Sequence, residues 1–406
     1  MSENKLPTKV RTMFFGILFS AIGNGLVLPY MFLFVHNILG FSTLTAGFLL
    51  SYGAMAALIS SPIWGFFVDR YGARSVLMFS LVISAISYAS LSLVHSLFEL
   101  FLVFTFCCIG QSGMWPAQGA INTFLTPEHL RERIYGAQFA VLNLGIGIGG
   151  LLSSTFVKLD NARTFEILFI GDGISYLLYL SAVIFLGKVP NKSVGATESK
   201  SEEDQGWTTV LADKIFRKVW LISLFAIFCG YAQLEVGFAA FSTSEAGLQP
   251  RDLAWAFAAN TFLIATCQLW VTKKLTNYSR KFAISAAVLF WAGAWAALAL
   301  SGLKFVSPLF WAITCQFIFG IGEMIWSPIM PSIVNQLAPD HLRGRYNSAS
   351  AATWQVGQIA GPAFAGLMLG WKVPWLWIGM LISALVAISV IASRLNLPQR
   401  EQNKIR

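Results

Sequence analysis

The chain has 406 residues, of which 56% are hydrophobic and only 12% are charged, and its mean hydropathy is +0.65. Soluble proteins carry about 25% charged residues, so this composition excludes a soluble enzyme, a disordered scaffold and a secreted disulfide framework. The net charge of +9 indicates basic loops beside anionic lipid headgroups. Nucleic-acid binding is excluded, because no soluble basic domain is present to carry it. We therefore expect a membrane protein.

Twelve apolar runs are long enough to cross a bilayer, which requires roughly 20 residues per helix. Their near-continuous aliphatic character excludes a transmembrane barrel, whose strands alternate apolar and polar residues. The first run lacks a small-residue cleavage site, so it is predicted to be an anchor and not a signal peptide. The predicted spans are 12–35, 44–67, 75–96, 98–123, 136–157, 165–187, 219–241, 253–272, 282–303, 306–336, 347–370 and 373–393.

The placement of lysine and arginine agrees with twelve spans. With both termini inside, 23 of the 28 basic residues lie in inner segments and 5 in outer loops. This excess is the positive-inside pattern of membrane proteins. We expect a multi-pass protein of the cell (inner) membrane with cytoplasmic N- and C-termini.

Residues 188–218 form the only long polar stretch. Their serine, lysine and glutamate content cannot bury apolar area, which favours a flexible cytoplasmic linker. The predicted organisation is a six-helix bundle over 1–187, the linker 188–218 and a second six-helix bundle over 219–406. The expected fold class is therefore an all-α membrane protein with two pseudo-symmetric bundles.

The two halves repeat each other in sequence. A shift of 212 residues aligns 110–149 with 322–361 without a gap, and 13 of the 40 positions are identical. The run His129-Leu130-Arg131-x-Arg133, for example, recurs as His341-Leu342-Arg343-x-Arg345. Parallel repeats of six helices are typical of secondary transporters.

Neither the cysteines nor the histidines form a metal-ligand pattern. The five cysteines lie inside apolar runs without a CxxC pair, and the four histidines are scattered. The sequence also lacks a Walker A motif and a recognisable nucleophile–base pair. We expect no metal, no cofactor and no catalytic residues, so the protein is not an enzyme and an ion gradient would drive transport.

The loop after the second span carries the motif that points to a family. It reads Gly65-x-x-x-Asp69-Arg70-x-Gly72-x-Arg74. This GxxxDRxGxR loop, together with twelve spans and a duplicated half, resembles the major facilitator superfamily over the whole chain. The resemblance implies that these five residues form a latch between the halves in the outward-facing state. Asp69 is an anion able to face a helix N-terminus.

Glycines at four-residue spacing occur in the fifth and eleventh spans. They are Gly145 and Gly149 in one, and Gly357 and Gly361, followed by Pro362, in the other. Small residues on one helix face allow close helix packing in lipid. The pattern resembles the glycine motif of the proton-coupled drug antiporters of the family, where it seals helices against leak. Ordinary helix packing is the alternative interpretation.

Three carboxylates lie inside predicted spans, where a charge is costly. They are Asp172, which shares a helix face with Ser175 and Tyr176, Glu235, and Glu323 near the centre of span ten. Each is a candidate proton-coupling group, and a structural hydrogen bond to a neighbouring helix is the alternative.

Other polar and aromatic residues are candidates for a substrate cavity. The resemblance implies that spans 1, 4, 7 and 10 line a central cavity, and aromatic rings suit a lipophilic or cationic ligand. Packing between helices is the alternative for each residue taken alone. The candidates are Asn24, Tyr30, Phe106, Gln111, Tyr231, Gln233 and Trp326.

The expected function is proton-coupled export of a small hydrophobic or drug-like solute by alternating access. The expected partners are this small-molecule substrate, protons and the lipid bilayer, and the chain is expected to be a monomer. Two alternatives remain open from the sequence. One is a transporter of a sugar, an amino acid or another metabolite, and the other is a membrane sensor that binds a ligand without moving it.

Overall fold

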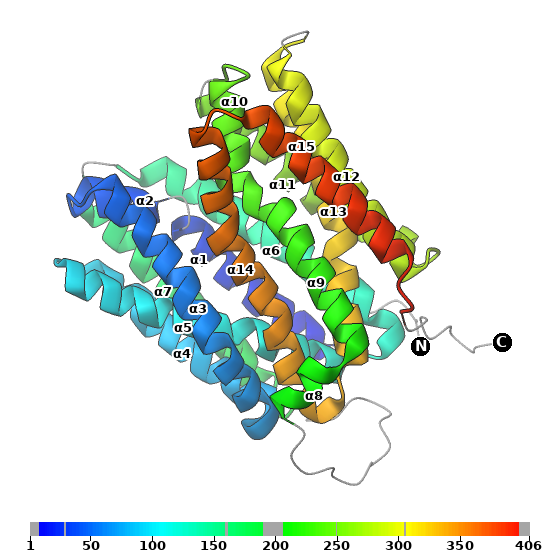
Figure 1. Ribbon diagram of the computed structural model, residues 1–406. Coiled ribbons are helices and arrows are strands. Elements are labelled where there is room, and N and C mark those ends of the chain that lie inside the picture. The colour runs from blue at the N-terminus through cyan, green and yellow to red at the C-terminus, as the bar shows by residue number, and fades with distance from the viewer. Residues whose placement is uncertain are drawn as a thin grey trace. The chain divides into compact units, whose positions relative to one another are not determined.

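Long apolar sequences fold as helices throughout the computed structural model, which describes residues 8–27, 30–158, 161–189, 206–248, 250–303 and 306–397 (Figure 1). No strand occurs among these residues. The long helices are α1 (Thr8–Val27), α3 (Thr43–Tyr71), α4 (Ala73–Ser90), α5 (Leu97–Leu125), α6 (Glu128–Phe156), α7 (Ala162–Phe185), α9 (Lys214–Cys229), α11 (Pro250–Leu275), α12 (Arg280–Gly302), α13 (Pro308–Leu337), α14 (Arg343–Gly370) and α15 (Pro374–Ser393). The short ones are α2 (Met31–Leu33), α8 (Trp207–Ala212) and α10 (Ala239–Ser244), with 3₁₀ or π turns at Phe34–Ile38, Leu91–Leu93, Tyr231–Gln233, Leu234–Phe238 and Asp340–Leu342.

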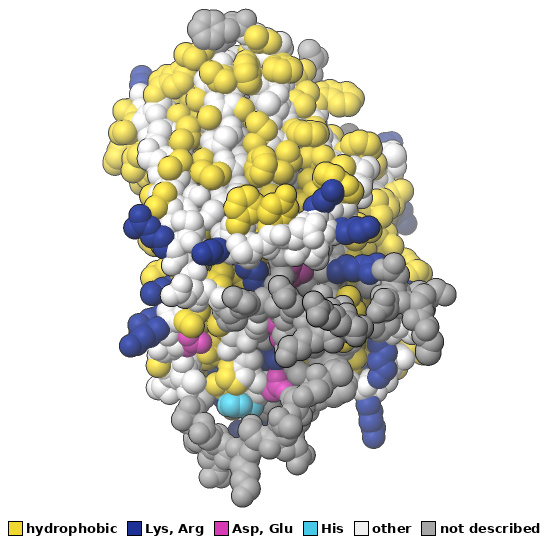
Figure 2. All heavy atoms as spheres, turned by 90° about the vertical axis from the view of Figure 1, so that its right-hand side faces the viewer, with side chains coloured by type: hydrophobic (Ala, Val, Ile, Leu, Met, Phe, Trp, Pro, Cys, Tyr) yellow, Lys and Arg dark blue, Asp and Glu magenta, His cyan; other side chains and the backbone are white. Residues whose placement is uncertain are grey.

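Ten helices in the described part of the chain are long and apolar enough to span a membrane, against the twelve predicted. The two that fall short, α11 and α14, are long enough but more polar, because they carry side chains such as Asn260, Gln268 and Gln355. On the face in Figure 2, hydrophobic side chains cover a broad area and Lys and Arg gather toward one end of it. A face of this kind matches a lipid core bounded by headgroups.

The first of two compact units contains Met1–Arg131, Val141–Val210 and Ala338–Ala352. Within it, α1 packs on α7, α4 packs on α5 and α7, and α3 packs on α5. Helix α5 begins at a capping box, in which Ser96 Oγ accepts from the Glu99 N–H at 3.3 Å and the Glu99 carboxylate accepts from the Ser96 N–H at 3.1 Å. This arrangement satisfies two N–H groups at the helix start.

The second unit contains Glu132–Ala140, Leu211–Leu337 and Thr353–Arg406. Within it, α13 packs on α11 and α12, and α12 packs on α15. Its core includes the fully buried rings of Trp291, Trp295 and Trp377. Each unit thus includes a short segment of the other sequence half, taken from the beginning of α6 or of α14.

The seventh predicted span, 219–241, is not one continuous helix. Helix α9 ends at Cys229, and a 3₁₀ turn and a π turn follow before α10. Side chains compensate for the interruption, because Gln233 Nε2 donates to the Phe228 carbonyl at 2.9 Å and Trp295 Nε1 donates to the Cys229 carbonyl at 2.8 Å. Freed backbone groups in a membrane helix need such partners.

Candidate functional site

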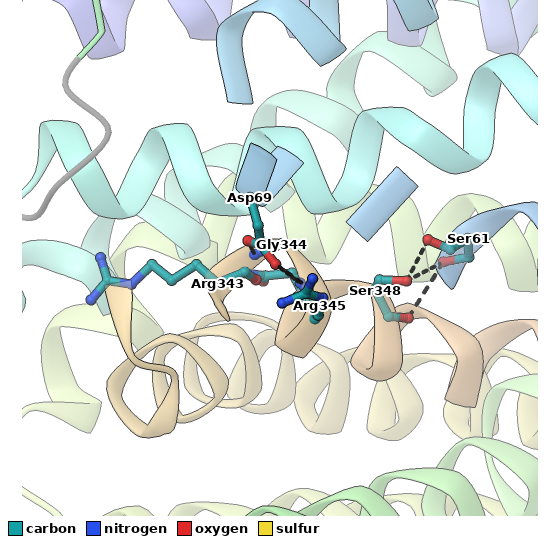
Figure 3. Close-up of polar contacts among 7 residues, drawn as sticks. Ser61, Asp69, Arg343, Gly344, Arg345 and Ser348 are labelled. Atoms are coloured by element: carbon teal, nitrogen blue, oxygen red, sulfur yellow. Dashed lines mark hydrogen bonds and ion pairs between the residues drawn. The ribbon is translucent and has the colours of Figure 1, made fainter. Parts of the chain in front are cut away.

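A cluster of close contacts joins the end of α3 to the beginning of α14 within unit 1 (Figure 3). The Asp69 carboxylate accepts from the backbone N–H groups of Gly344 at 2.6 Å and Arg345 at 3.2 Å, and it lies 3.8 Å from Arg345 Nε. The first N–H groups of a helix lack intrahelical partners and carry partial positive charge. The Asp69 side chain therefore caps the N-terminus of α14.

Two glycines allow the backbones of α3 and α14 to meet at this contact. A methyl group at Gly65 would lie 2.7 Å from Ser348 Cβ, and one at Gly344 would lie 2.6 Å from Asp69 Oδ1. One turn earlier on α3, the Ser61 hydroxyl lies 3.0 Å from the Ser348 hydroxyl. Tight backbone packing and charge complementarity thus act together.

The other residues of the GxxxDRxGxR loop shape the turn around Asp69. Gly72 ends α3 with a φ of +87°, a conformation that favours glycine. Arg74 donates to the carbonyls of Val183 and Ile184 at the end of α7, both at 3.3 Å. Arg70 lies over the Phe66 ring, 5.8 Å from its centroid.

Replacing Gly344 with valine should destabilise the protein, because the new side chain would collide with Asp69 and the α3 backbone. Overpacking of this kind costs about 1–3 kcal/mol. The matched control is Gly366→Val in the same helix, where an added methyl group meets no atom within 4 Å. Thermal unfolding of the purified protein should show a lower Tm for Gly344→Val alone. An equal shift in both variants would contradict the packing role.

Unit 2 contains a contact in which a cation replaces the anion. Arg280, at the beginning of α12, lies against Glu132 of α6. Arg280 Nε lies 2.9 Å from Glu132 Oε1, and the two side chains are only 4% and 7% exposed. Arg280 also donates to Ser332 and Gln336 of α13. The 212-residue shift aligns Glu132 with Gly344, so the same repeat position meets an anion in one unit and a cation in the other.

A buried carboxylate lies on α13 within unit 2. Glu323 of α13 is 6% exposed, and its Oε2 accepts from Asn260 Nδ2 of α11 at 2.6 Å. The Tyr231 hydroxyl, at the interruption after α9, also interacts with this carboxylate. Among the described residues, neither lysine nor arginine forms an ion pair with Glu323. The Glu323 carboxylate therefore accepts hydrogen bonds from uncharged donors, so a proton or a cation could still neutralise its charge.

Aromatic rings surround the Tyr231 side of this carboxylate. The Tyr231 ring contacts Trp354 at a centroid distance of 4.8 Å, Trp291 at 5.1 Å and Phe319 at 5.5 Å. Trp326 continues the cluster, 5.2 Å from Trp291. Trp354 is 42% exposed whereas Trp291 is fully buried, so the cluster extends from the surface of the unit into its core. Ring faces attract cations.

A second polar cluster lies within unit 1. Gln111 Nε2 of α5 donates to Tyr176 Oη of α7 at 2.9 Å and to Asn24 Oδ1 of α1 at 3.2 Å. One turn away, Asp172 is fully buried, and its Oδ1 accepts from Ser175 Oγ at 3.0 Å. Its other oxygen, Oδ2, lacks a partner in the described structure. Asn24, Gln111 and Asp172 therefore belong to one neighbourhood in unit 1, whereas Glu323 belongs to unit 2.

The remaining cavity candidates have other partners. Gln233 is fully buried and its Oε1 accepts from Trp377 Nε1 at 3.0 Å, so its amide supports the interruption after α9. Phe106 is 49% exposed on α5. Tyr30 packs edge-on against Phe165 at a centroid distance of 6.3 Å. The side chain of Glu235 lies outside the described residues.

The glycine pairs lie where helices approach closely. A methyl group on Gly145 would lie 2.5 Å from Ala21 Cβ of α1, and one on Gly149 would lie 2.9 Å from Gly25 Cα. In unit 2, a methyl group on Gly357 would lie 2.8 Å from Ile227 Cγ2 of α9. Gly361, which precedes Pro362 in α14, packs in the same way against Ala232.

Several residues of these sites were not predicted as site residues from the sequence. They include the aromatic partners of Tyr231 and the Arg280–Glu132 ion pair. The internal repeat contained one sign of the ion pair, because Glu132 is charged whereas the residue at the same repeat position, Gly344, is not. In the described part of the chain, no group of three or more His, Cys, Asp and Glu side chains could hold a metal ion.

Comparison with known proteins identifies the family. The sequence model of the Major Facilitator Superfamily matches residues 13–290 and 236–406. The chain belongs to this superfamily. It is similar to the MFS-type transporter YttB of Bacillus subtilis, with 24% identity over 95% of this chain and 94% of that protein.

More distant relatives agree with this assignment. The quinolone resistance protein NorA of Staphylococcus aureus is 20% identical over 89% of each chain. The crystal structure of a bacterial homologue of the iron transporter ferroportin shares the fold, with a TM-score of 0.78, 11% identity and coverage of 95% of this chain and 98% of that one. The predicted family and the all-α fold are thereby confirmed, and this superfamily member is a multi-pass membrane transporter and not an enzyme.

Proposed function

We propose that this transporter exports small hydrophobic, drug-like solutes, including lipophilic cations, in exchange for protons. The observation that carries the proposal is Glu323, a buried carboxylate bonded to Asn260 and bordered by the aromatic cluster around Tyr231. A carboxylate held only by neutral donors can bind a proton or an organic cation, but the two compete for its charge. The distant similarity to NorA, a quinolone resistance protein, supports the same substrate class.

In the proposed cycle, Glu323 releases its proton when the solute enters from the cytoplasm and takes up another from outside. The two sequence halves, 1–187 and 219–406, would move as bodies joined by the linker 188–218, as alternating access requires. The Asp69 contact and the Arg280–Glu132 pair would act as latches that hold one end state. Asp172 and Glu235 are further candidate proton sites, and the glycine pairs would keep helices sealed.

The proposed setting follows from the distribution of charge. Placing both termini in the cytoplasm puts 23 of the 28 basic residues on that side, and the similar MFS-type transporters YttB and NorA come from bacteria. We place the protein in the bacterial cell membrane as a monomer.

Flux of a lipophilic cation tests this proposal. Purified protein in liposomes with an acidic lumen should accumulate ethidium, because protons leaving the lumen drive the dye inward. Without the pH gradient, the dye should only equilibrate. Flux that ignores the gradient would reject proton coupling. Flux of sugars or amino acids but not of ethidium would reject the substrate class and favour a metabolite transporter.

A further inference from the structure

Helices α11 and α13 pack against each other in unit 2 (Figure 1). Polar side chains lie at their interface. Residues spaced by four, seven or eight lie on one helix face, and both helices present such a set. We call these residues the α11–α13 seam. It comprises Asn260, Gln268 and Thr272 of α11 and Gln316, Glu323 and Ser327 of α13.

Hydrogen bonds connect the residues of the seam on both sides of the Glu323 carboxylate along the helices. Asn260 Nδ2 donates both to Glu323 Oε2 and, at 3.2 Å, to the carbonyl oxygen of Gln316. On the other side, Gln268 Nε2 donates at 3.0 Å to Thr272 Oγ1 and at 3.0 Å to the carbonyl of the residue after Glu323. The seam therefore runs from the middle of α13 toward the end of α11 that is predicted to be cytoplasmic.

Four buried polar atoms of the seam have no hydrogen-bond partner in the described structure. They are Nε2 and Oε1 of Gln316, Oε1 of Gln268 and Oγ of Ser327. Gln316 and Gln268 are both fully buried. Buried polar groups in proteins are satisfied by protein or by ordered water. These atoms indicate positions where water would bind. Those of Gln268 and Ser327 lie on the side of Glu323 that faces the predicted cytoplasmic end, and those of Gln316 lie on the other side.

Helix packing alone does not require this polarity. The 212-residue shift aligns Gln316, Glu323 and Ser327 of α13 with Phe104, Gln111 and Trp115 of α5. Two of the three positions are therefore aromatic in unit 1. In unit 1, Phe104 is buried and Trp115 is 53% exposed. A buried apolar side chain therefore fills the position that the polar Gln316 occupies in unit 2, so helix packing does not require a polar residue there.

We propose that the α11–α13 seam is a hydrated path that carries protons between Glu323 and the cytoplasmic side. The inference rests on the proposed function, because it assigns the route of the proton that Glu323 exchanges. In the step, the protonated carboxyl gives its proton to a seam water, which in turn passes a proton on toward Thr272. Gln268 Oε1 and Ser327 Oγ accept hydrogen bonds from these waters, and the carboxylate left behind accepts from Asn260 Nδ2.

Cysteine labelling tests the hydration of the seam without relying on transport. In a background lacking the five native cysteines, Ser327→Cys should react with a small charged methanethiosulfonate reagent from the cytoplasmic side. Ile329→Cys is the matched control, because this fully buried α13 residue belongs to the apolar core of unit 2. A thiol at 327 should react at least about tenfold faster than one at 329, since only the hydrated thiol ionises and meets the reagent. Equal rates would overturn the proposal.

A flux measurement separates this path from the proposed function. Gln268→Leu should slow gradient-driven ethidium accumulation about tenfold while leaving ethidium exchange unchanged, because exchange moves no net proton. If the wild type couples to protons and Gln268→Leu accumulates ethidium at the wild-type rate, the proton path is rejected but the proposed function is not. Fast labelling of Ser327→Cys together with wild-type flux that ignores the pH gradient would reject proton coupling, and with it the role of the seam in proton transfer, although the seam would still be hydrated.

Discussion

Replacing Glu323 with glutamine should abolish concentrative transport and leave only passive, non-concentrative exchange of substrate. At a gradient equivalent to about 100 mV, one proton supplies ~2.3 kcal/mol, enough for roughly fiftyfold accumulation of the dye in wild-type liposomes. The variant should reach only equal concentrations, because glutamine keeps a hydrogen-bond acceptor for Asn260 but cannot exchange a proton. Ethidium accumulation and ethidium exchange are measured in parallel.

Conservative changes at other carboxylates serve as controls for this prediction. Glu166→Gln makes the same chemical change near the start of α7 and should behave as wild type. Asp172→Asn and Glu235→Gln test the two other candidate proton sites. Concentrative transport that survives Glu323→Gln but fails in one of these variants would move the coupling site to that residue.

Breaking the Arg280–Glu132 pair should produce the largest loss of stability. Both side chains are nearly inaccessible to solvent, and removing one partner of a buried ion pair costs about 3–5 kcal/mol. Arg280→Met retains the apolar stem but removes the guanidinium, so we expect a clear fall in Tm. Arg163→Met, at the exposed start of α7, is the control and should leave the Tm unchanged.

The double variant Arg280→Met with Glu132→Leu distinguishes the pair from a general effect of substitution. Replacing a buried ion pair by apolar residues of similar size is often nearly neutral, so the double variant should recover much of the lost Tm. Additive losses in the double variant would show that the two residues act independently.

The sequence predicted those features that depend on composition and local order. The apolar runs, the internal repeat and the GxxxDRxGxR loop were sufficient to predict the family and an all-α fold, because lipid forces each chain segment to satisfy its own backbone in helices. The same hydropathy pattern did not reveal the interruption after Cys229. A single glycine, Gly230, lies in an apolar run there, and the side chains that satisfy the freed carbonyls come partly from α12.

The partners of the candidate site depend on packing between distant helices. Asn260 meets Glu323 across 63 positions and Arg280 meets Glu132 across 148. Such contacts depend on the crossing of helices and on side-chain orientation, for which one sequence holds little signal. The rings around Tyr231 could not be singled out from the sequence, because the chain has 58 aromatic residues. Charged residues within apolar runs are scarce and therefore easier to recognise.

Proton release on substrate binding tests the central claim most directly. Ethidium would be added to purified protein in weakly buffered detergent solution near neutral pH, and the change in pH recorded. Linkage between the two ligands predicts that the wild type releases up to about one proton per ethidium bound. Glu323→Gln lacks the charge and should bind ethidium more weakly, and it should release no proton when ethidium is raised to saturation. Binding without proton release by the wild type, or equal release by both proteins, would contradict competition between proton and solute at Glu323.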